Sequence, residues 1–413
     1  MTLIKEQTIC KICKSNLNEF LSLGETPPAN AFLKKEDFSK EKSYPLRVGF
    51  CQTCHLVQLM DVISRKHLFS HYVYFYSAMP TASKHFSAYT QEVISRFIKE
   101  PQKDFIVEIG SNDGLLLKAF QDSGCSRVLG VDPAKNIAEF ANQQGVPTIA
   151  DFFSKKLARE ITGKEGRAQV IIGNNVVAHI DDVHDLVQGV NELLDESGVF
   201  IFEAPYLMDM FENLAYDSIY HEHLSYLAVA PLMHLFGQYG MELFDVKIVQ
   251  RQGNSIRVFV CRKGTHPVAA SVSSFLKNER KSGLDKLETY QKLAERIYHS
   301  RDMLKKTLAK LKRQGKTIAT YGAPARGNTI LNFCGINNDI VDFATEELSS
   351  KIGFYTPGTH IPVKDIHEAR ENPPDYYVML AWSYKEAIIK KEKEFIKRGG
   401  KFIVPIGDNI HIL

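Results

Sequence analysis

The stretch FIVEIGSNDG, residues 105–114, constrains the fold of this 413-residue chain more than any other. A short apolar run ends in a Gly-containing loop and leads into a helical pattern, which is typical of the first unit of an open α/β sheet. Further short runs rich in β-branched residues follow, each closed by Gly, Asp or Pro. They are Val128–Val131, Gln169–Gly173 and Val199–Phe202, with helical patterns such as Leu115–Ser123 and Lys135–Gln144 between them. We therefore expect a mostly parallel, buried sheet.

The alternation ends in a different way. Glu242–Gln250 and Ser255–Arg262 are two strand patterns separated by a few residues that include Gly253, and this spacing is typical of a β-hairpin. A parallel sheet that closes with an antiparallel hairpin fits the class I methyltransferase fold, which is Rossmann-like, better than it fits a plain dehydrogenase.

The loop after the first strand has acidic side chains on and near it. Glu108 and Gly110 come at the carboxyl end of that strand, and Asp132 ends the next strand pattern. Gly110 allows a ligand to approach the backbone, and the Asp132 carboxylate can accept hydrogen bonds from both hydroxyls of a ribose. A nicotinamide dinucleotide would use a similar layout, but its G-x-G-x-x-G fingerprint leaves room for a pyrophosphate.

The next two loop residues distinguish between the two candidate cofactors. Asn112 and Asp113 stand where the dinucleotide fingerprint has small or neutral residues, and the Asp113 carboxylate would repel a pyrophosphate. S-adenosylmethionine has no phosphate and carries a sulfonium and an ammonium group, which acidic side chains suit. Asp151 and Phe152 follow the third short strand and offer an acceptor and an aromatic face to an adenine. The sequence thus favours an S-adenosylmethionine-dependent methyltransferase.

We expect three domains: residues 1–75, residues 76–265 with the cofactor loop, and residues 266–413. A long amphipathic helix is predicted over residues 283–314, followed by a second Rossmann-like α/β unit with strands at Thr317–Tyr321, Ile340–Ala344, Tyr376–Ala381 and Lys401–Pro405. The loop GAPARGNT after its first strand could cradle a phosphate with backbone N–H groups and Arg326. The alternative, weighted equally, is a turn whose glycines only allow close packing.

Two C-x2-C pairs lie in the first 75 residues, a segment too short for a large core of its own. Cys10, Cys13, Cys51 and Cys54 can complete a tetrahedral zinc site, which would be structural because four thiolates leave no open position. Two alternatives carry less weight. Residues 51–55, CQTCH, match a c-type haem attachment motif, and each pair could also do thiol redox chemistry.

The N-terminus lacks the apolar run of a signal peptide, and no stretch has the roughly 18 apolar residues of a membrane span. We expect a cytoplasmic protein that acts without a membrane. With 51 basic and 48 acidic residues, the net charge of +3 gives no indication of a nucleic-acid partner. We expect a small-molecule substrate and a monomer, although composition leaves the oligomeric state open.

The segment YHEH at 220–223 concentrates titratable side chains after the fifth strand, on the cofactor side of the sheet. Histidine exchanges protons near neutral pH, and a neighbouring carboxylate can orient its ring. His179, after the fourth strand, falls on the same side, although a lone histidine there is more often a capping or loop residue. Methylating a carbon next to a ketone requires a base and a group that stabilises an enolate, and this cluster fits that task.

Taken together, these motifs resemble the sugar C-methyltransferases that make branched deoxysugars on nucleotide carriers. The resemblance covers essentially the whole chain. It includes the two C-x2-C pairs, YVYF at 72–75, EIGSNDG, YHEHLSYL, QGNSIRV at 252–258, GAPARGNT at 322–329 and TPGTHIPV at 356–363. It implies an N-terminal zinc domain, a central methyltransferase domain and a C-terminal domain that helps to hold a sugar nucleotide.

The resemblance also implies residue roles. His223 would remove the C3 proton of a 4-keto sugar linked to dTDP, and Tyr220 and Glu222 would orient the reacting groups. Tyr74 and His179 would lie near the sugar, and the substrate contacts would include Arg326, Asn328 and Tyr226. Tyr76 departs from the family pattern, which has a small residue there, and this departure puts the identity of the sugar in doubt. The methylated carbon also varies within the family.

Three other functions remain as alternatives. The first is an O- or N-methyltransferase acting on a small metabolite. The second is an RNA-binding protein that uses the zinc module, which the near-neutral charge disfavours. The third is a sugar-nucleotide-binding scaffold without activity.

Overall fold

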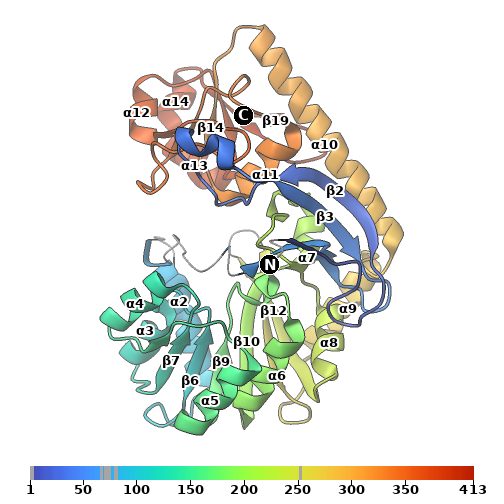
Figure 1. The fold of residues 1–413 in the computed structure, drawn as a ribbon, viewed down its shortest axis with the longest axis vertical. Helices are drawn as coiled ribbons and strands as arrows, with labels where there is room; N and C mark the ends of the chain where they lie inside the picture. Colours follow the sequence, from blue (N-terminus) through green and yellow to red (C-terminus); the bar gives the residue numbers. More distant parts are fainter. Residues whose placement is uncertain (1–3, 66–67, 69–75, 79–81, 251–253) are drawn as a thin grey trace.

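The computed structural model describes residues 4–65, 68, 76–78, 82–250 and 254–413. Figure 1 shows the methyltransferase-like sheet at the bottom, a second α/β unit at the top and a small N-terminal sheet beside the junction between them. The long helix α10 (Leu287–Arg313) runs along one side of the upper unit and past β2 (Asn18–Thr26). Among the described residues, we find no helix that is both long and apolar enough to span a membrane.

The central sheet has seven strands in the order β12-β13-β10-β9-β6-β7-β8. The strands from β10 to β8 pair in parallel, and β13 pairs antiparallel with both β10 and β12. This topology confirms the class I methyltransferase fold and its closing hairpin. The strands are β6 (Ile106–Ile109), β7 (Val128–Val131), β8 (Thr148–Ile149), β9 (Ala168–Ile172), β10 (Leu194–Pro205), β12 (Met241–Gln250) and β13 (Asn254–Arg262).

Both faces of this sheet are covered, which explains why its strands are apolar throughout. Side chains alternate between faces along a strand, so Ile106 of β6 packs with Leu116 and Phe120, while Val107 packs in the core on the other face. The first of these faces is covered by helices including α2 and α3, and the second by α5 and α6. Helices of this domain are α2 (Ala82–Phe97), α3 (Leu115–Asp122), α4 (Lys135–Gln143), α5 (Lys155–Glu165), α6 (Val183–Leu193), α7 (Leu207–Glu212) and α8 (Val229–Gly237).

The N-terminal sheet takes one of its strands from the central domain. Its order is β11-β4-β3-β2, where β11 (Ser225–Tyr226) pairs antiparallel with β4 (Val57–Leu59). β3 (Tyr44–Phe50) completes the sheet, and β1 (Ile4–Glu6) pairs separately with β5 (Asp61–Ile63). The sequence did not predict β11, because two residues are too few to show a strand period.

Helix α9 (Ala270–Lys281) packs on α8 and β12 of the central domain, and α10 leads from it to the C-terminal unit, which contains a six-stranded sheet in the order β16-β15-β14-β17-β18-β19. The predicted long helix is confirmed. The second strand starts at Phe343 rather than at Ile340, because residues 337–341 form a hydrogen-bonded turn. The elements are β14 (Ile318–Tyr321), α11 (Ala325–Cys334), β15 (Phe343–Glu346), β16 (Val363–Asp365), α12 (Ile366–Glu371), β17 (Tyr376–Met379), η5 (Trp382–Tyr384), α13 (Lys385–Lys391), α14 (Lys393–Lys397), β18 (Lys401–Val404) and β19 (His411–Ile412).

Candidate active site

The loop after β6 brings the backbone close to its neighbours at the carboxyl edge of the sheet. Gly110 has φ +67°, and a Cβ there would lie 2.3 Å from Cγ2 of Val176. Val176 comes just before η3 (Val177–His179), so the cofactor loop and the segment that carries His179 are in contact. The glycine is required here both by its backbone angle and by the space available.

Three carboxyl groups meet at this edge with little compensating positive charge. Glu108 and Asp113 are buried, and among the described residues neither Oε2 of Glu108 nor Oδ1 of Asp113 has a hydrogen-bond partner. Burial raises the pKa of Glu108 well above its ordinary value, and the charges of Asp113 and Asp132 add to this. A bound cation would relieve this cost, so the donor set fits the sulfonium and ammonium groups of S-adenosylmethionine and disfavours a pyrophosphate.

The other predicted cofactor residues lie on the ends of the neighbouring strands. Asp132, after β7, accepts hydrogen bonds from the backbone N–H groups of Asn112 and Ala134 at 3.0 Å each, and burial raises its pKa. Asp151 is exposed, and the guanidinium of Arg65 lies 4.5 Å from the ring centre of Phe152. The strand order places these residues beside Glu108 and Gly110 along one edge.

A tyrosine and a histidine three residues apart form a hydrogen-bonded pair. Nδ1 of His223 lies 2.7 Å from the carbonyl oxygen of Ser218, and Nε2 lies 2.8 Å from the Tyr220 hydroxyl oxygen. A carbonyl only accepts, so in the neutral ring Nδ1 carries the proton. Nε2 is then the basic nitrogen, and the Tyr220 hydroxyl donates to it. The backbone therefore fixes the tautomer that a general base needs.

His179 lies against the same ring. The centroids of His179 and His223 are 4.9 Å apart in an edge-to-face arrangement. Burial lowers the pKa of His179 to about 4. Burial also lowers the pKa of His223 well below its ordinary value, with a further contribution from His179. Both imidazoles are therefore neutral at pH 7, and His223 can accept a proton.

The two remaining residues of the YHEH segment have different environments. Glu222 is buried, and its Oε1 accepts a hydrogen bond of 2.7 Å from Asn30 of the N-terminal part. Burial raises the pKa of Glu222 to about 7, although Asn30 opposes the shift. His221 is also buried, but its Nε2 donates to the Pro45 carbonyl in β3 at 3.0 Å. Only His223 of the two histidines therefore belongs to the site.

The C-terminal unit holds the segment that precedes Tyr220. Asp217, in η4 (Tyr216–Ser218), is buried and accepts hydrogen bonds from Arg326 at 2.7 Å and from the Trp382 indole at 2.8 Å. The Thr329 hydroxyl donates to the Ile219 carbonyl at 2.9 Å. Sequence reasoning missed Asp217 and Trp382, since a single Asp in a loop and a lone Trp form no motif.

A small cavity of about 20 Å³ lies beside His223. Its lining is mainly apolar, but His223, Ser218, Ser225 and Tyr226 add polar groups. Tyr226 is buried, and within the described part of the chain its hydroxyl has no hydrogen-bond partner. Burial raises the pKa of this phenol well above its ordinary value, so the hydroxyl stays protonated and can act as a donor.

The structure brings most of the predicted site residues together and leaves others apart. His223 contacts both Tyr220 and His179, and Tyr226 lines the cavity next to His223. Asn328 is buried in α11 and donates to the Ala29 carbonyl at 2.7 Å. Tyr74 lies outside the described residues.

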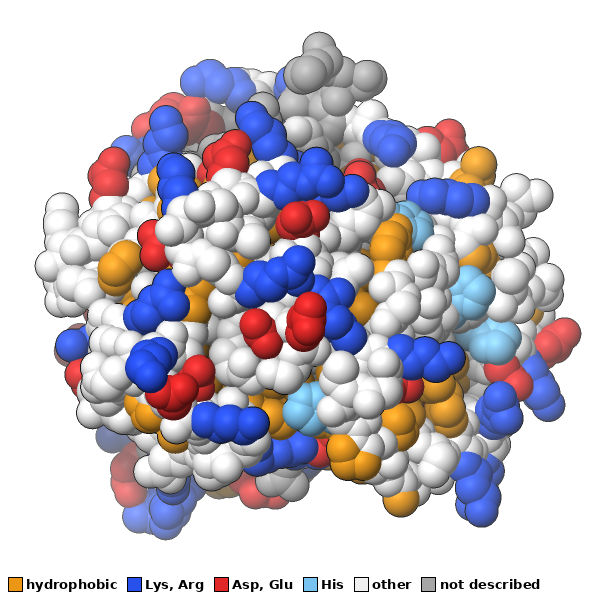
Figure 2. Space-filling model, turned by 90° about the horizontal axis from the view of Figure 1, so that it is seen from below, with side chains coloured by type: hydrophobic (Ala, Val, Ile, Leu, Met, Phe, Trp, Pro, Cys, Tyr) orange, Lys and Arg blue, Asp and Glu red, His pale blue; other side chains and the backbone are white. Residues whose placement is uncertain are grey.

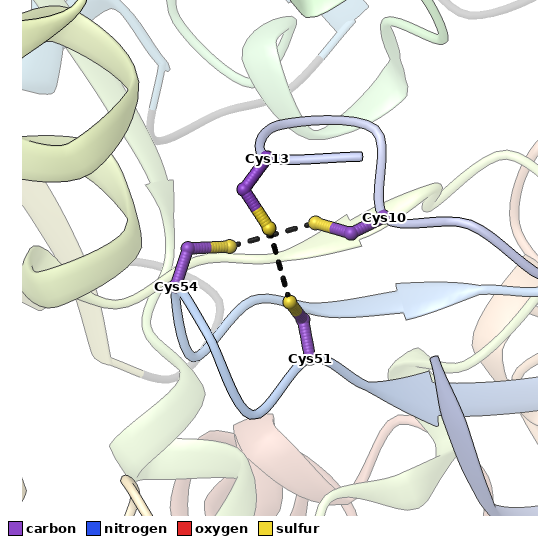
Figure 3. Close-up of side chains that lie close together, drawn as sticks. All are labelled: Cys10, Cys13, Cys51 and Cys54. Carbon is purple, nitrogen blue, oxygen red and sulfur yellow. Dashed lines mark hydrogen bonds between the residues drawn. The ribbon is translucent and has the colours of Figure 1, made fainter. Parts of the chain in front are cut away.

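The four predicted zinc ligands point toward a common centre (Figure 3). Their sulfur atoms all lie within 4.8 Å of one another, and the closest pairs are Cys13 with Cys51 at 3.3 Å and Cys10 with Cys54 at 3.5 Å. A tetrahedral Zn–S₄ site has sulfur–sulfur distances of about 3.8 Å, so the cluster fits zinc. The knuckle of residues 51–54 joins β3 to β4, and the knuckle of residues 10–13 packs beside it.

Comparison with known proteins gives the family. The model described as "Putative zinc binding domain" matches residues 10–69, "Methyltransferase domain" matches 82–246, and "C-methyltransferase C-terminal domain" matches 250–407. The chain is 37% identical over 400 residues to the C-methyltransferase NovU of Streptomyces niveus, covering 96% of this chain and 95% of that protein. The chain belongs to the C-methyltransferase family. This C-methyltransferase therefore depends on S-adenosylmethionine, and its cysteine cluster belongs to the zinc-binding domain.

Solved methyltransferase structures match less than half of the C-methyltransferase, at low scores. Magnesium protoporphyrin IX methyltransferase from Synechocystis PCC 6803 is 12% identical, with a TM-score of 0.34 over 44% of this chain and 79% of its own. A methyltransferase from Listeria monocytogenes is also 12% identical, with a TM-score of 0.34 over 43% and 99%. At such scores the family assignment rests on the sequence matches.

Proposed function

We propose that this C-methyltransferase methylates a nucleotide-linked 4-keto-deoxysugar at C3, through an enolate. The observation that carries the proposal is the Tyr220–His223 pair with its tautomer fixed by the Ser218 carbonyl. Methyl transfer to oxygen or nitrogen requires alignment and at most a simple base. A prearranged neutral imidazole beside a cavity suits removal of a proton from carbon.

The proton transfer follows from these positions. Nε2 of His223 takes the proton from C3, and the C–H electron pair forms the C3–C4 double bond of an enolate with its charge on the C4 oxygen. Tyr220 gives up its hydrogen bond to Nε2 when the substrate enters. The Tyr226 hydroxyl, buried and protonated, lines the small cavity beside His223 and is suited to donate to the enolate oxygen once the sugar is bound. Burial, which lowers the pKa of His223, keeps the base neutral.

When bound, S-adenosylmethionine supplies an electrophilic methyl group. Glu108, Asp113 and Asp132 would hold it at the carboxyl edge of the sheet, with Gly110 giving the room that its approach requires. Asp151 and Phe152, on the neighbouring strand end, would face the adenine.

The sugar nucleotide would extend toward the C-terminal unit. The Arg326 side chain remains 25% exposed while it is paired with Asp217, so it can add a contact to a phosphate. On the face shown in Figure 2, basic and acidic side chains are intermixed. On this face the mixture does not favour a nucleic-acid backbone.

The test is incubation with a panel of dTDP-4-keto-deoxysugars in D₂O, first without and then with labelled S-adenosylmethionine. The proposal expects deuterium at C3 without the methyl donor and a new C3–methyl bond with it, read by NMR and mass spectrometry. A product methylated on oxygen or nitrogen, without deuterium exchange, would contradict the proposal and support the alternative methyltransferase function.

A further inference from the structure

A buried lysine stands between two of the zinc ligands. Lys11, in the knuckle Cys10–Cys13, is only 5% exposed. Its ammonium group lies 3.3 Å from the Ile180 carbonyl oxygen and 3.4 Å from the Leu224 carbonyl oxygen. Burying a cation is costly unless it is well solvated by the protein. A packing role would need only an apolar side chain of similar length.

The two carbonyl groups belong to residues next to the histidines of the site. Ile180 follows His179 and Leu224 follows His223, and these two rings are in edge-to-face contact at 4.9 Å. The loops come from different places in the chain, one after β9 and the other after η4. A single cation that binds one carbonyl from each loop limits how far the loops can separate.

A chain of glutamines ties the same knuckle to the same two loops. The Lys11 N–H donates to Oε1 of Gln58 at 2.8 Å, and Gln58 donates to Gln7 at 3.2 Å. Gln7 in turn donates to Asp181 at 2.6 Å, two residues beyond His179. Gln58 also lies opposite Ser225 in the β4–β11 pair, two residues beyond His223.

The next knuckle residue makes a further contact with the His179 side. Nε2 of His184 donates to the Ile12 carbonyl at 2.9 Å, and its Nδ1 is 2.7 Å from the Tyr239 hydroxyl. The knuckle is therefore joined to residues 180–184 by two direct hydrogen bonds, Lys11 to Ile180 and His184 to Ile12, and the Gln58–Gln7 chain adds an indirect link to Asp181. Zinc would hold this knuckle to residues 51–54 and hence to β4 (Figure 3).

We infer that Lys11 is a positioning residue of the active site, through which the zinc knuckle sets the spacing of His179 and His223. The inference rests on the proposed role of His223 as the base. Zinc itself takes no part in the reaction. The backbone of residues 10–13 fixes the position of the Lys11 ammonium group, which binds the two carbonyl groups. Each carbonyl group in turn fixes the position of the histidine that precedes it in the chain.

The experiment compares Lys11→Met, Lys11→Arg and the control Lys5→Met, which alters an exposed lysine of the same domain. Four properties are measured: zinc content, the affinity for S-adenosylmethionine by calorimetry, the deuterium exchange rate at the sugar C3 without methyl donor, and the histidine ring ¹⁵N resonances. If Lys11→Met does not fold, Lys11→Gln replaces it.

For Lys11→Met we expect full zinc content and unchanged cofactor affinity. The rate of deuterium exchange at the sugar C3 and kcat should both fall by roughly ten- to a hundredfold, because a small displacement of a catalytic group slows the reaction strongly. KM should change little. Lys11→Arg should recover most of the exchange, since it can still donate to both carbonyls. The resonances of His179 and His223 should shift in Lys11→Met and stay in place in Lys5→Met.

Two results would overturn the inference. One is wild-type exchange and unshifted histidine resonances in Lys11→Met. The other is a loss of exchange that follows a loss of zinc, which would make Lys11 a part of metal binding alone. If the wild-type enzyme exchanges no sugar hydrogen, the proposed function fails, and the histidine resonances still test whether Lys11 places the two rings.

Discussion

The Tyr220 hydroxyl oxygen lies 2.8 Å from Nε2 of His223, and this contact defines the resting state of the proposed base. The ring cannot turn without losing its bond to the Ser218 carbonyl, so the basic nitrogen always faces the tyrosine. Substrate must therefore displace a hydrogen bond before C3 can lose its proton.

Replacing the base should separate binding from chemistry. We expect His223→Asn to bind S-adenosylmethionine normally and to lose C3 exchange and methylation by about 10² to 10⁴-fold, which is the usual contribution of a general base. His221→Asn is the matched control for folding, because His221 faces β3 instead of the site. Wild-type exchange in His223→Asn would refute the assignment of the base.

Asp217 should matter through its effect on the catalytic segment. Asp217→Asn weakens the pairing with Arg326, although an amide can still accept from Trp382. We expect a lower kcat with unchanged affinity for S-adenosylmethionine. We also expect a changed pH profile, because Ser218 and its carbonyl would be held less firmly beside His223. An unaltered kcat and pH profile would show that this contact only joins the domains.

Glu222 gives a prediction for stability against pH. Its folded-state pKa of about 7 lies above the ordinary 4.5, so the folded protein binds its proton more tightly than the unfolded chain does. The stability that this group contributes is present below pH 4.5 and is lost as the pH rises through 7. Glu222→Gln should therefore raise the free energy of unfolding at pH 8.5 by about 3 kcal/mol and leave it unchanged at pH 4. Denaturant titrations at both pH values check this, and an equal effect at both would contradict it.

Gly110 should be required for cofactor binding. In Gly110→Ala the new Cβ would meet Val176 at 2.3 Å in addition to the cost of a positive φ. Gly145→Ala is the control, since it has φ +79° and open space around it. We expect each variant to lose about 1–2 kcal/mol from its backbone angle, and only Gly110→Ala to lose affinity for S-adenosylmethionine in calorimetry. Equal affinities would contradict the proposed cofactor site.

Removing the metal should affect the N-terminal part first. Cys54→Ser breaks the knuckle next to β4, and we expect a lower zinc content and an earlier thermal transition. Cofactor affinity should persist, because the seven-stranded sheet carries that site on other residues. Full zinc occupancy in this variant would contradict the four-cysteine site.

Much of the fold could be predicted from the sequence, because strands and cysteine pairs are indicated by patterns of neighbouring residues. The β7 strand lies at the predicted Val128–Val131, and the cysteine spacing correctly predicted the cluster. Contacts between distant segments gave no such signal. Asp217 meets Arg326 across 109 positions in the chain, and nothing in YHEH shows that His221 turns toward β3 while His223 turns toward Tyr220. These outcomes depend on tertiary packing, which a single sequence does not encode at short range.

The strand β11 has a practical consequence for engineering. Because Ser225 and Tyr226 complete the sheet of the N-terminal part, that part cannot be exchanged for a relative's as a self-contained block of about 65 residues. A chimaera would need to transplant residues 225–226 with it, together with the partners of Lys11 and Asn30. The metal domain and the segment around β11 should therefore be exchanged together in any hybrid enzyme.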